Sequence, residues 1–369
     1  MTSLRALLRD RIREAGPITL ADYMGAALLH PKHGYYASRD PFGARGDFVT
    51  APEVSQVFGE LLGLWCADCW ARLGAPDPIV LTELGPGRGT LMADALRAAA
   101  VVPGFPGALR VHLVEASAHL AAQQRAALPG IEVVWHERLE DLPEGPMLLL
   151  ANEFLDALPI RQFERRAEGW AERRVGLSEN GQSFQFVLDD PPDDLAADLG
   201  SLSFPDAGPG EIAEICPRAR EVASEIARRV SRFGGAALMI DYGYEGPLTG
   251  DSFQAIRDGA PADPLDGPGS ADISAHVDFS ALAQAAHDAG AWTHGPVPQG
   301  IFLRALGLEA RIEALGKTAD ANQARALAAA FERLVSPDQM GRLFRCLAVT
   351  ERAQFVPAGF PIHPAPDSG

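Results

Sequence analysis

Residues 81–97, LTELGPGRGTLMADALR, place three glycines and a proline between two apolar runs. A buried strand that enters a glycine-rich turn and continues as a helix is the arrangement by which many α/β proteins hold a cofactor. Glycine suits this position because, having no Cβ, it lets a ligand approach the backbone closely. The stretch therefore predicts a strand, a cofactor-binding turn and a helix in immediate succession.

The chain after residue 78 alternates between short apolar runs and amphipathic segments. This alternation predicts an α/β fold with a Rossmann-like, doubly wound and mostly parallel sheet. In such a sheet the first and fourth strands lie side by side at the switch point, where ligands bind beyond the strands' carboxyl ends. The predicted strands are 79–84, 109–116, 131–135, 147–152 and 235–243, and the predicted helices are 90–100, 117–127 and 217–233.

Two stretches interrupt this alternation. Residues 160–190 alternate in polarity around Glu168-Gly169 and Asn180-Gly181, which predicts an antiparallel hairpin insertion. We accordingly divide the chain into an N-terminal helical and lid segment, a main α/β domain with two insertions, and a loose tail. The boundaries are 1–75, 76–356 with insertions at about 160–215 and 244–320, and 357–369.

The N-terminal segment holds a loop and a helix of its own. The glycine- and tyrosine-rich loop at about 31–50 is a candidate lid over the cofactor, although its tyrosines could equally be packing residues. Thr50 and Glu53 have the spacing of a capping box, so we expect a helix to begin there. Cys66 and Cys69 fall on this helix, and we interpret them as buried structural thiols, since nothing nearby completes a set of metal ligands.

Bulk properties narrow the choice of partners. The formal net charge of −17 repels nucleic acid and would attract a basic protein segment, although many proteins are acidic simply for solubility. Four cysteines in 369 residues form no disulfide framework, and no apolar run is long enough for membrane insertion. The amphipathic N-terminus contains Asp10, Glu14 and Asp22, which is unlike a transit peptide, so we expect a cytoplasmic, bacterial protein.

Two details of the glycine turn and two acids at strand ends indicate that the ligand is S-adenosylmethionine. Pro86 removes an N–H donor that a phosphate-binding turn would use, and the spacing Glu83-x-Gly85-x-Gly87-x-Gly89 is not G-x-G-x-x-G. Glu83 at the end of the first strand suits the ligand's ammonium and sulfonium charges. Glu115 at the end of the second strand is placed to accept both ribose hydroxyl groups. A turn that only packs the helix against the strand is the structural alternative.

Five blocks of the sequence resemble the MidA-like methyltransferase family, in the family's order, over residues 20–350. They are GDFVTAPEVSQVFGE, ELGPGRGTLMADALR, NEFLDALPIRQF, DYGY and DISAHVDF. The mitochondrial members are arginine methyltransferases that assist assembly of respiratory complex I. The resemblance implies a class I methyltransferase fold, S-adenosylmethionine as methyl donor, and a protein arginine, in a complex I subunit for example, as acceptor.

The acceptor side should lie just past the fourth strand, where Asn152, Glu153 and Asp156 follow one another. We expect Asn152 to contribute to the cofactor site. Glu153 and Asp156 are the candidate catalytic carboxylates, since they can hold a guanidinium group and take up its proton. Acids at such a junction also cap helices, and for Asp156 capping is an equal alternative.

Three further residues are candidates for binding the acceptor: Asp241, Tyr242 and His276. The first two end the fifth strand at the same sheet edge, and His276 precedes Asp278, which we expect to cap a helix. A lone histidine is also often a structural residue.

Two other functions stay open at this point. The chain could be a non-catalytic assembly factor that binds S-adenosylmethionine only as a structural ligand, or a nicotinamide-dependent oxidoreductase, which Pro86 and the glycine spacing disfavour. The sequence does not set the oligomeric state, for which a homodimer is one option.

Overall fold

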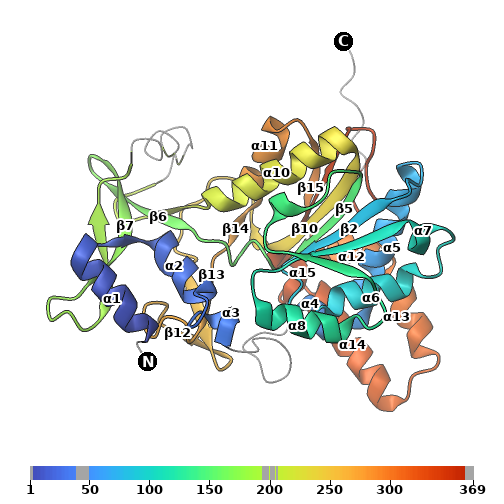
Figure 1. Cartoon of the computed structure of the whole chain (residues 1–369), viewed down its shortest axis with the longest axis horizontal. Coiled ribbons are helices and arrows are strands. Elements are labelled where there is room, and N and C mark those ends of the chain that lie inside the picture. The colour runs from blue at the N-terminus through green and yellow to red at the C-terminus, as the bar shows by residue number, and fades with distance from the viewer. Residues whose placement is uncertain (1–2, 39–49, 193–198, 200–203, 205–206, 362–369) are drawn as a thin grey trace, which may run out of the picture.

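The computed structural model describes residues 3–38, 50–192, 199, 204 and 207–361, and among these a central sheet of eight strands organises the larger part of the molecule (Figure 1). Five strands run parallel, and β16 and β15 add an antiparallel edge. The short β14 pairs with the end of β10. In spatial order the strands are β15 (Trp292–Pro298), β16 (Phe344–Thr350), β10 (Gly235–Tyr244), β5 (Met147–Asn152), β2 (Ile79–Leu84), β3 (Leu109–Val114) and β4 (Val133–His136), with β14 at Val277–Asp278.

The predicted neighbours at the switch point are confirmed. β2 and β5 pair in parallel, with Glu83 opposite Leu150, and β10 pairs with the other side of β5, with Ile240 opposite Asn152. Every residue of β2 and β5 is buried, as expected for strands covered on both faces. The carboxyl ends of β2, β5 and β10 therefore meet at one edge of the sheet, where ligands bind in folds of this kind.

Helices cover both faces of the central sheet and bury a separate apolar core on each. The helix α10, for example, turns a row that includes Val222, Ile226 and Val230 toward the sheet, at helical spacing. The elements of one face are α4 (Ala51–Val54), α5 (Gln56–Arg72), α6 (Thr90–Ala99), α7 (Phe105–Ala108), α12 (Gln299–Ala305), α13 (Leu308–Gly316), α14 (Ala321–Val335) and α15 (Met340–Leu343). Those of the other are η1 (Leu139–Asp141), α10 (Pro217–Phe233) and α11 (Phe279–Asp288). The helix α8 (Ala118–Ala127) follows β3.

A smaller lobe, on the left in Figure 1, joins the N-terminus to the two insertions. It confirms the predicted antiparallel hairpin as part of a larger sheet in the order β1-β7-β6-β9, with β8 on β7. Its strands are β1 (Ile18–Thr19), β6 (Arg161–Arg166), β7 (Gly169–Leu177), β8 (Phe184–Asp189), β9 (Ile212–Ile215), β11 (Gln254–Arg257), β12 (Ala260–Ala262) and β13 (Asp272–Ser274). Its helices are α1 (Leu4–Ala15), α2 (Leu20–Leu29) and α3 (Tyr35–Ser38).

The predicted capping box at Thr50 is wrong. The Thr50 side chain makes no capping hydrogen bond, and the helix expected from that point is two helices separated by Ser55, whose extended backbone (φ −161°) ends α4 and whose side chain caps α5. The carboxylate of Glu53 instead accepts a 2.6 Å hydrogen bond from the Thr90 hydroxyl, at the start of α6. The helix α4 is thus tied to the first residue of α6, directly after the glycine turn. Cys66 and Cys69 are buried on α5, as predicted.

Two predicted boundaries also change. Residues 357–361 are not a loose tail, because Phe360 is buried against Phe302 and the Ala358 carbonyl accepts a hydrogen bond from the Trp65 indole. Residues 362–369 lie outside the described residues. Within the predicted insertion at 244–320, β15 and α12 belong to the central sheet and its core.

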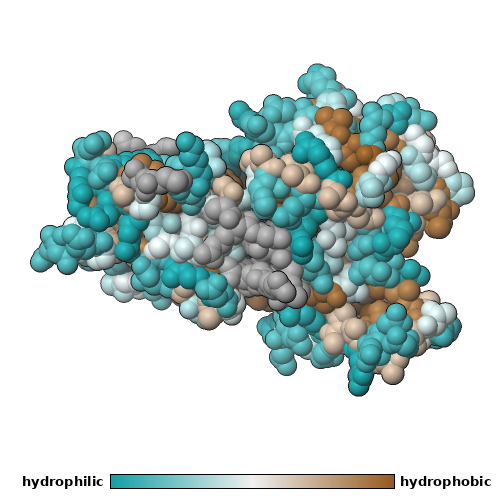
Figure 2. Space-filling model, turned by 60° about the horizontal axis from the view of Figure 1, so that its bottom comes forward, coloured by the Kyte–Doolittle hydropathy of each residue, from teal (hydrophilic) through white to brown (hydrophobic). Residues whose placement is uncertain are grey.

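The surface drawn in Figure 2 is mostly hydrophilic, and its larger apolar patches lie on the side that carries the central sheet. Within the described part of the chain, every helix is too short or too polar to cross a membrane.

Candidate functional site

The glycine turn between β2 and α6 is held in a conformation that favours glycine at three positions. Gly85, Gly87 and Gly89 have φ values of 60°, 53° and 85°. The turn is tied to β3 by a 3.0 Å bond from the Gly85 N–H to the Val114 carbonyl, and it is closed by a 2.8 Å bond from the Gly89 N–H to the Pro86 carbonyl. A Cβ on Gly85 would approach the Phe154 ring to 2.8 Å. The turn therefore presents backbone toward the end of β5.

A cavity of about 240 Å³ opens beside this turn. It runs from the glycines past the end of β3 to the loop after β4, and a smaller hollow continues from Gly85 and Gly87 between the turn and the end of β5. Residues that line one or both include Tyr36, Glu83, Gly85, Pro86, Gly87, Glu115, Glu137, Arg138, Asn152, Glu153, Phe154 and Arg218. Of the predicted cofactor residues, the structure brings all but Gly89 to these surfaces.

Two buried oxygens at the inner end of the site have no hydrogen-bond partner among the described residues: Glu83 Oε2 and Asn152 Oδ1. Burial raises the pKa of Glu83 to about 8, since desolvation penalises its charged form. A buried polar atom without a partner costs about 1–3 kcal/mol, so a ligand that supplies a donor or a positive charge would relieve this cost. The ammonium and sulfonium of S-adenosylmethionine fit these acceptors.

Glu115, at the end of β3, is oriented by two donors. Its Oε1 accepts from the Ser117 N–H at 2.7 Å, and its Oε2 accepts from Gln124 Nε2 at 3.0 Å. A carboxylate has about four acceptor positions, so each oxygen retains capacity toward the cavity. Glu115 also lines the cavity, so its carboxylate can accept further donors there.

Sequence reasoning missed Gln124 and left Tyr36 undecided. Gln124 is fully buried, and the available signal was its place four residues after Leu120 on the buried face of α8 and four before Leu128, which ends the helix. The backbone carbonyl of Tyr36 accepts a 2.8 Å hydrogen bond from the Ser117 hydroxyl, and the Tyr36 hydroxyl donates to Asp272 at 3.0 Å. The predicted lid thus reaches the cavity through Tyr36, whereas its residues 39–49 lie outside the described part of the chain.

Glu153 and Asp156 follow β5 in a loop with unusual backbone geometry. Glu153 has a left-handed φ of 50°, which few residues other than glycine adopt. Its Oε1 accepts from the Ala51 N–H at 2.9 Å and from Asn152 Nδ2 at 3.2 Å. Burial raises the pKa of Glu153 to about 7 and that of Asp156 to about 6.

Asp156 does not cap a described helix, whereas Asp278 does. Of the described helices, none begins at Asp156, whose Oδ2 accepts a 2.8 Å hydrogen bond from the Tyr242 hydroxyl. Asp278 does cap α11, through the N–H groups of Ser280 and Ala281.

Asp241 lies beneath this loop and is inaccessible to solvent. Its Oδ2 accepts from the backbone N–H groups of Leu155 at 2.9 Å and of Asp156 at 3.1 Å. Its pKa is raised well above the usual range by burial and by the nearby Asp156 and Glu153. Asp241 was predicted to bind the acceptor, but its position favours holding the loop, whereas Tyr242 contacts Asp156 directly.

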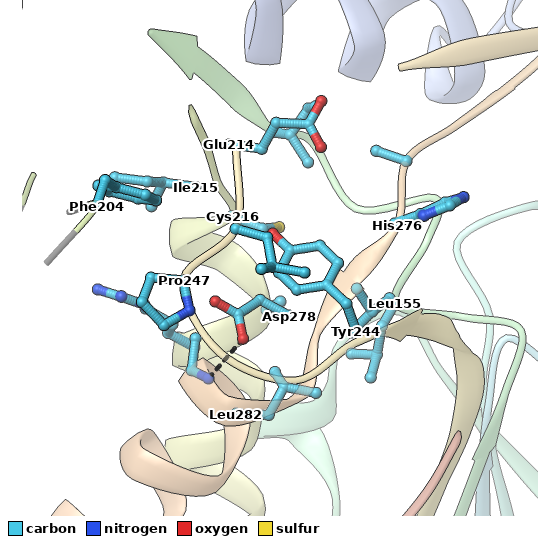
Figure 3. A pocket seen from close by; sticks show the side chains of 17 residues that line it. Leu155, Phe204, Glu214, Ile215, Cys216, Tyr244, Pro247, His276, Asp278 and Leu282 are labelled. Carbon is cyan, nitrogen blue, oxygen red and sulfur yellow. Dashed lines mark hydrogen bonds between the residues drawn. The ribbon is translucent and has the colours of Figure 1, made fainter. Parts of the chain in front are cut away.

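His276 lies at a second, smaller cavity of about 30 Å³ (Figure 3). Figure 3 shows the Tyr244 ring in its middle, with Glu214 and Asp278 on opposite sides of the ring. His276 packs edge-to-face on Tyr242, with ring centroids 5.4 Å apart, and its backbone N–H donates to the Ser252 hydroxyl. This arrangement joins His276 to the loop acids through Tyr242, and acceptor contact by His276 stays a prediction.

Comparison with known proteins agrees with this geometry. Residues 61–297 match the family described as "Putative S-adenosyl-L-methionine-dependent methyltransferase". The chain is similar to the protein arginine methyltransferase NDUFAF7, mitochondrial, of Danio rerio (36% identity, covering 94% of this chain and 86% of that one) and of Homo sapiens (35%, 95% and 83%).

A solved structure extends the similarity to the fold. It is a Burkholderia thailandensis protein bound to S-adenosyl-homocysteine, with a TM-score of 0.83 and 30% identity over 96% of this chain and 93% of that one. The glycine turn and the two unpartnered oxygens beside it agree with these matches. The matches show that the chain belongs to this family of S-adenosyl-L-methionine-dependent methyltransferases.

Proposed function

We propose that the protein transfers a methyl group to an arginine side chain of a protein, with a respiratory complex I subunit as the candidate acceptor. The observation that carries the proposal is the group of carboxyls past β5 and β10: the half-buried Glu153 and Asp156 and the fully buried Asp241. The names of the relatives, which are protein arginine methyltransferases, support the same acceptor.

On the cofactor side, we assign each predicted residue a task that its position supports. Gly85, Pro86 and Gly87 present the turn, and Gly89 starts α6 with a backbone that packs on α8 at Gln124. Glu83 and Asn152 would meet the positively charged end of the ligand through their unpartnered oxygens. Glu115 would accept the ribose hydroxyl groups.

On the acceptor side, S-adenosylmethionine supplies a methyl group on a sulfonium, and the protein must align a nucleophile with it. Guanidinium stays protonated and offers forked donors, so two carboxylates can hold it in one orientation. We assign this role to Glu153 and Asp156. The pKa values of both carboxyls are raised, so a bound guanidinium cation would relieve the cost of ionising them. The ionised carboxylates could then accept the proton that methyl transfer releases.

In this proposal Asp241 and Tyr242 do not bind the acceptor themselves but position the residues that do. Asp241 fixes the backbone of Leu155 and Asp156, and the Tyr242 hydroxyl orients the Asp156 carboxylate. His276 supports the Tyr242 ring.

Replacing Glu115 tests the cofactor side. We expect Glu115→Ala to weaken S-adenosyl-homocysteine binding by about 10–150-fold, the value of hydrogen bonds to a charged group. Glu132→Ala, which removes an equal charge from an exposed position before β4, at the opposite edge of the sheet, should bind like the parent. Calorimetric titration of the three proteins measures this, and parental affinity in a folded Glu115→Ala protein would contradict the assignment.

Replacing Glu153 separates binding from chemistry. Glu153→Gln keeps the side-chain length and an acceptor for the Ala51 N–H but loses the charge. It should bind S-adenosylmethionine within about threefold of the parent and transfer methyl at least about 100-fold more slowly, the scale of a positioned acid–base group. Asp156→Asn should show a smaller loss.

The assay for this pair is transfer of labelled methyl to a complex I subunit, with Glu132→Gln as the matched control. Parental rates in both variants would contradict the catalytic assignment. A parent protein that transfers nothing yet supports complex assembly would favour the non-catalytic assembly factor instead.

The pH dependence follows from the sign of the Glu153 shift. Since its pKa is raised to about 7, Glu153 is largely protonated in mildly acidic solution and ionises as the pH rises. With saturating S-adenosylmethionine, kcat/KM for the acceptor should rise with pH and then level off. The midpoint should lie at or slightly below 7, because the sulfonium of the bound S-adenosylmethionine favours the ionised form of Glu153. A pH–rate series measures this limb, and the same limb in Glu153→Gln would show that another group titrates.

A further inference from the structure

The fully buried side chain of Gln124 joins three parts of the cofactor site. Its Nε2 donates to the Gly87 carbonyl at 2.9 Å and to Glu115 Oε2 at 3.0 Å, while its Oε1 accepts from the Trp135 indole at 2.9 Å. The partners come from the glycine turn, the end of β3 and the strand β4. Both N–H donors of the amide are therefore used, and they link the two cofactor-binding segments to each other.

These contacts restrict two groups that face the cavity. Glu115 is held at one oxygen by Ser117 and at the other by Gln124, so its carboxylate plane cannot rotate freely. The Gly87 carbonyl belongs to a left-handed residue, and its bond to Gln124 fixes the following peptide. Trp135 in turn prevents the amide from flipping, because a flipped amide would direct an N–H at the indole N–H.

The packing around Gln124 agrees with a positioning role. A Cβ on Gly89 would lie 3.4 Å from Gln124 Cα and 3.5 Å from Ala127 Cβ, so the turn rests directly on α8. The Arg125 guanidinium lies over the face of the Trp135 ring, 4.3 Å from its centroid, and helps to hold the indole in place. A buried amide with this set of partners is energetically expensive to replace.

We propose that Gln124 is a positioning residue for the cofactor: through its amide it holds Glu115 and the glycine turn in the arrangement that binds the ribose hydroxyl groups. The proposal rests on the role of Glu115 given above. Gln124 itself lines neither the cavity nor the smaller hollow beside the glycine turn. A glutamine that only stabilised the packing of α8 would affect the melting temperature, but not the selectivity for the hydroxyl groups.

The test compares S-adenosyl-homocysteine with its 2′-deoxy counterpart in the parent, in Gln124→Met and in Gln123→Met. The parent should bind the deoxy ligand at least about tenfold more weakly, as expected for a hydrogen bond to a charged acceptor. In Gln124→Met this difference should fall below about threefold. Gln123→Met carries the same substitution one residue away, where the half-buried amide is bonded to His119 on the same helix and not to the glycine turn or Glu115, and should keep the parental difference.

Each outcome decides the proposal. A folded Gln124→Met protein that keeps the parental difference would overturn it while leaving the role of Glu115 intact. A parent protein indifferent to the 2′-hydroxyl would overturn both. If Gln124→Met does not fold, Gln124→Leu serves instead, because it removes both N–H donors with a shorter apolar side chain; the same loss of selectivity is expected, and its retention would refute the proposal.

Discussion

The site depends on a pair of hydrogen bonds that Asp241, at the end of β10, accepts from the backbone of the loop after β5. Because β10 and β5 are paired strands, these bonds fix Leu155 and Asp156 relative to the sheet. The left-handed conformation of Glu153 then turns its side chain to the Ala51 N–H and to the hollow beside the glycine turn. One buried carboxylate thus fixes the loop that carries two others, and of these Glu153 lines the hollow where we propose that a cationic ligand binds.

Such a concentration of buried acids is unfavourable without a ligand. The pKa of Glu153 is about 7 when folded and lower when unfolded, so the folded state binds more protons between these values. Its contribution to stability is therefore present at low pH and lost as the pH rises through about 7. Asp156 and Glu83 shift in the same direction. A site that weakens the fold at neutral pH and favours cations is suited to a sulfonium donor and, in the proposed function, a guanidinium acceptor.

The sequence was most informative where burial alone decides the structure. The strands at 79–84 and 147–152 have the predicted bounds, because continuous apolar runs in a parallel sheet are buried on both faces. Features set by contacts distant in sequence were missed. Thr50 makes no capping hydrogen bond with Glu53, the Ala51 N–H donates to Glu153, Phe360 packs against Phe302, and Gln124 is identifiable only once β3, β4 and the turn surround it.

The central claim is that the carboxyl groups of the site bind a positively charged ligand and ionise when they do so. It can be tested by measuring the protons that they release. With a pKa of about 8, Glu83 is mostly protonated at pH 7 and should ionise when S-adenosylmethionine binds beside it. Calorimetric titration at pH 7 in buffers of different ionisation enthalpy counts the protons exchanged. We expect release of about one proton, less with S-adenosyl-homocysteine, which lacks the sulfonium, and less again in Glu83→Gln. Binding without proton release, or with release unchanged in Glu83→Gln, would contradict the account.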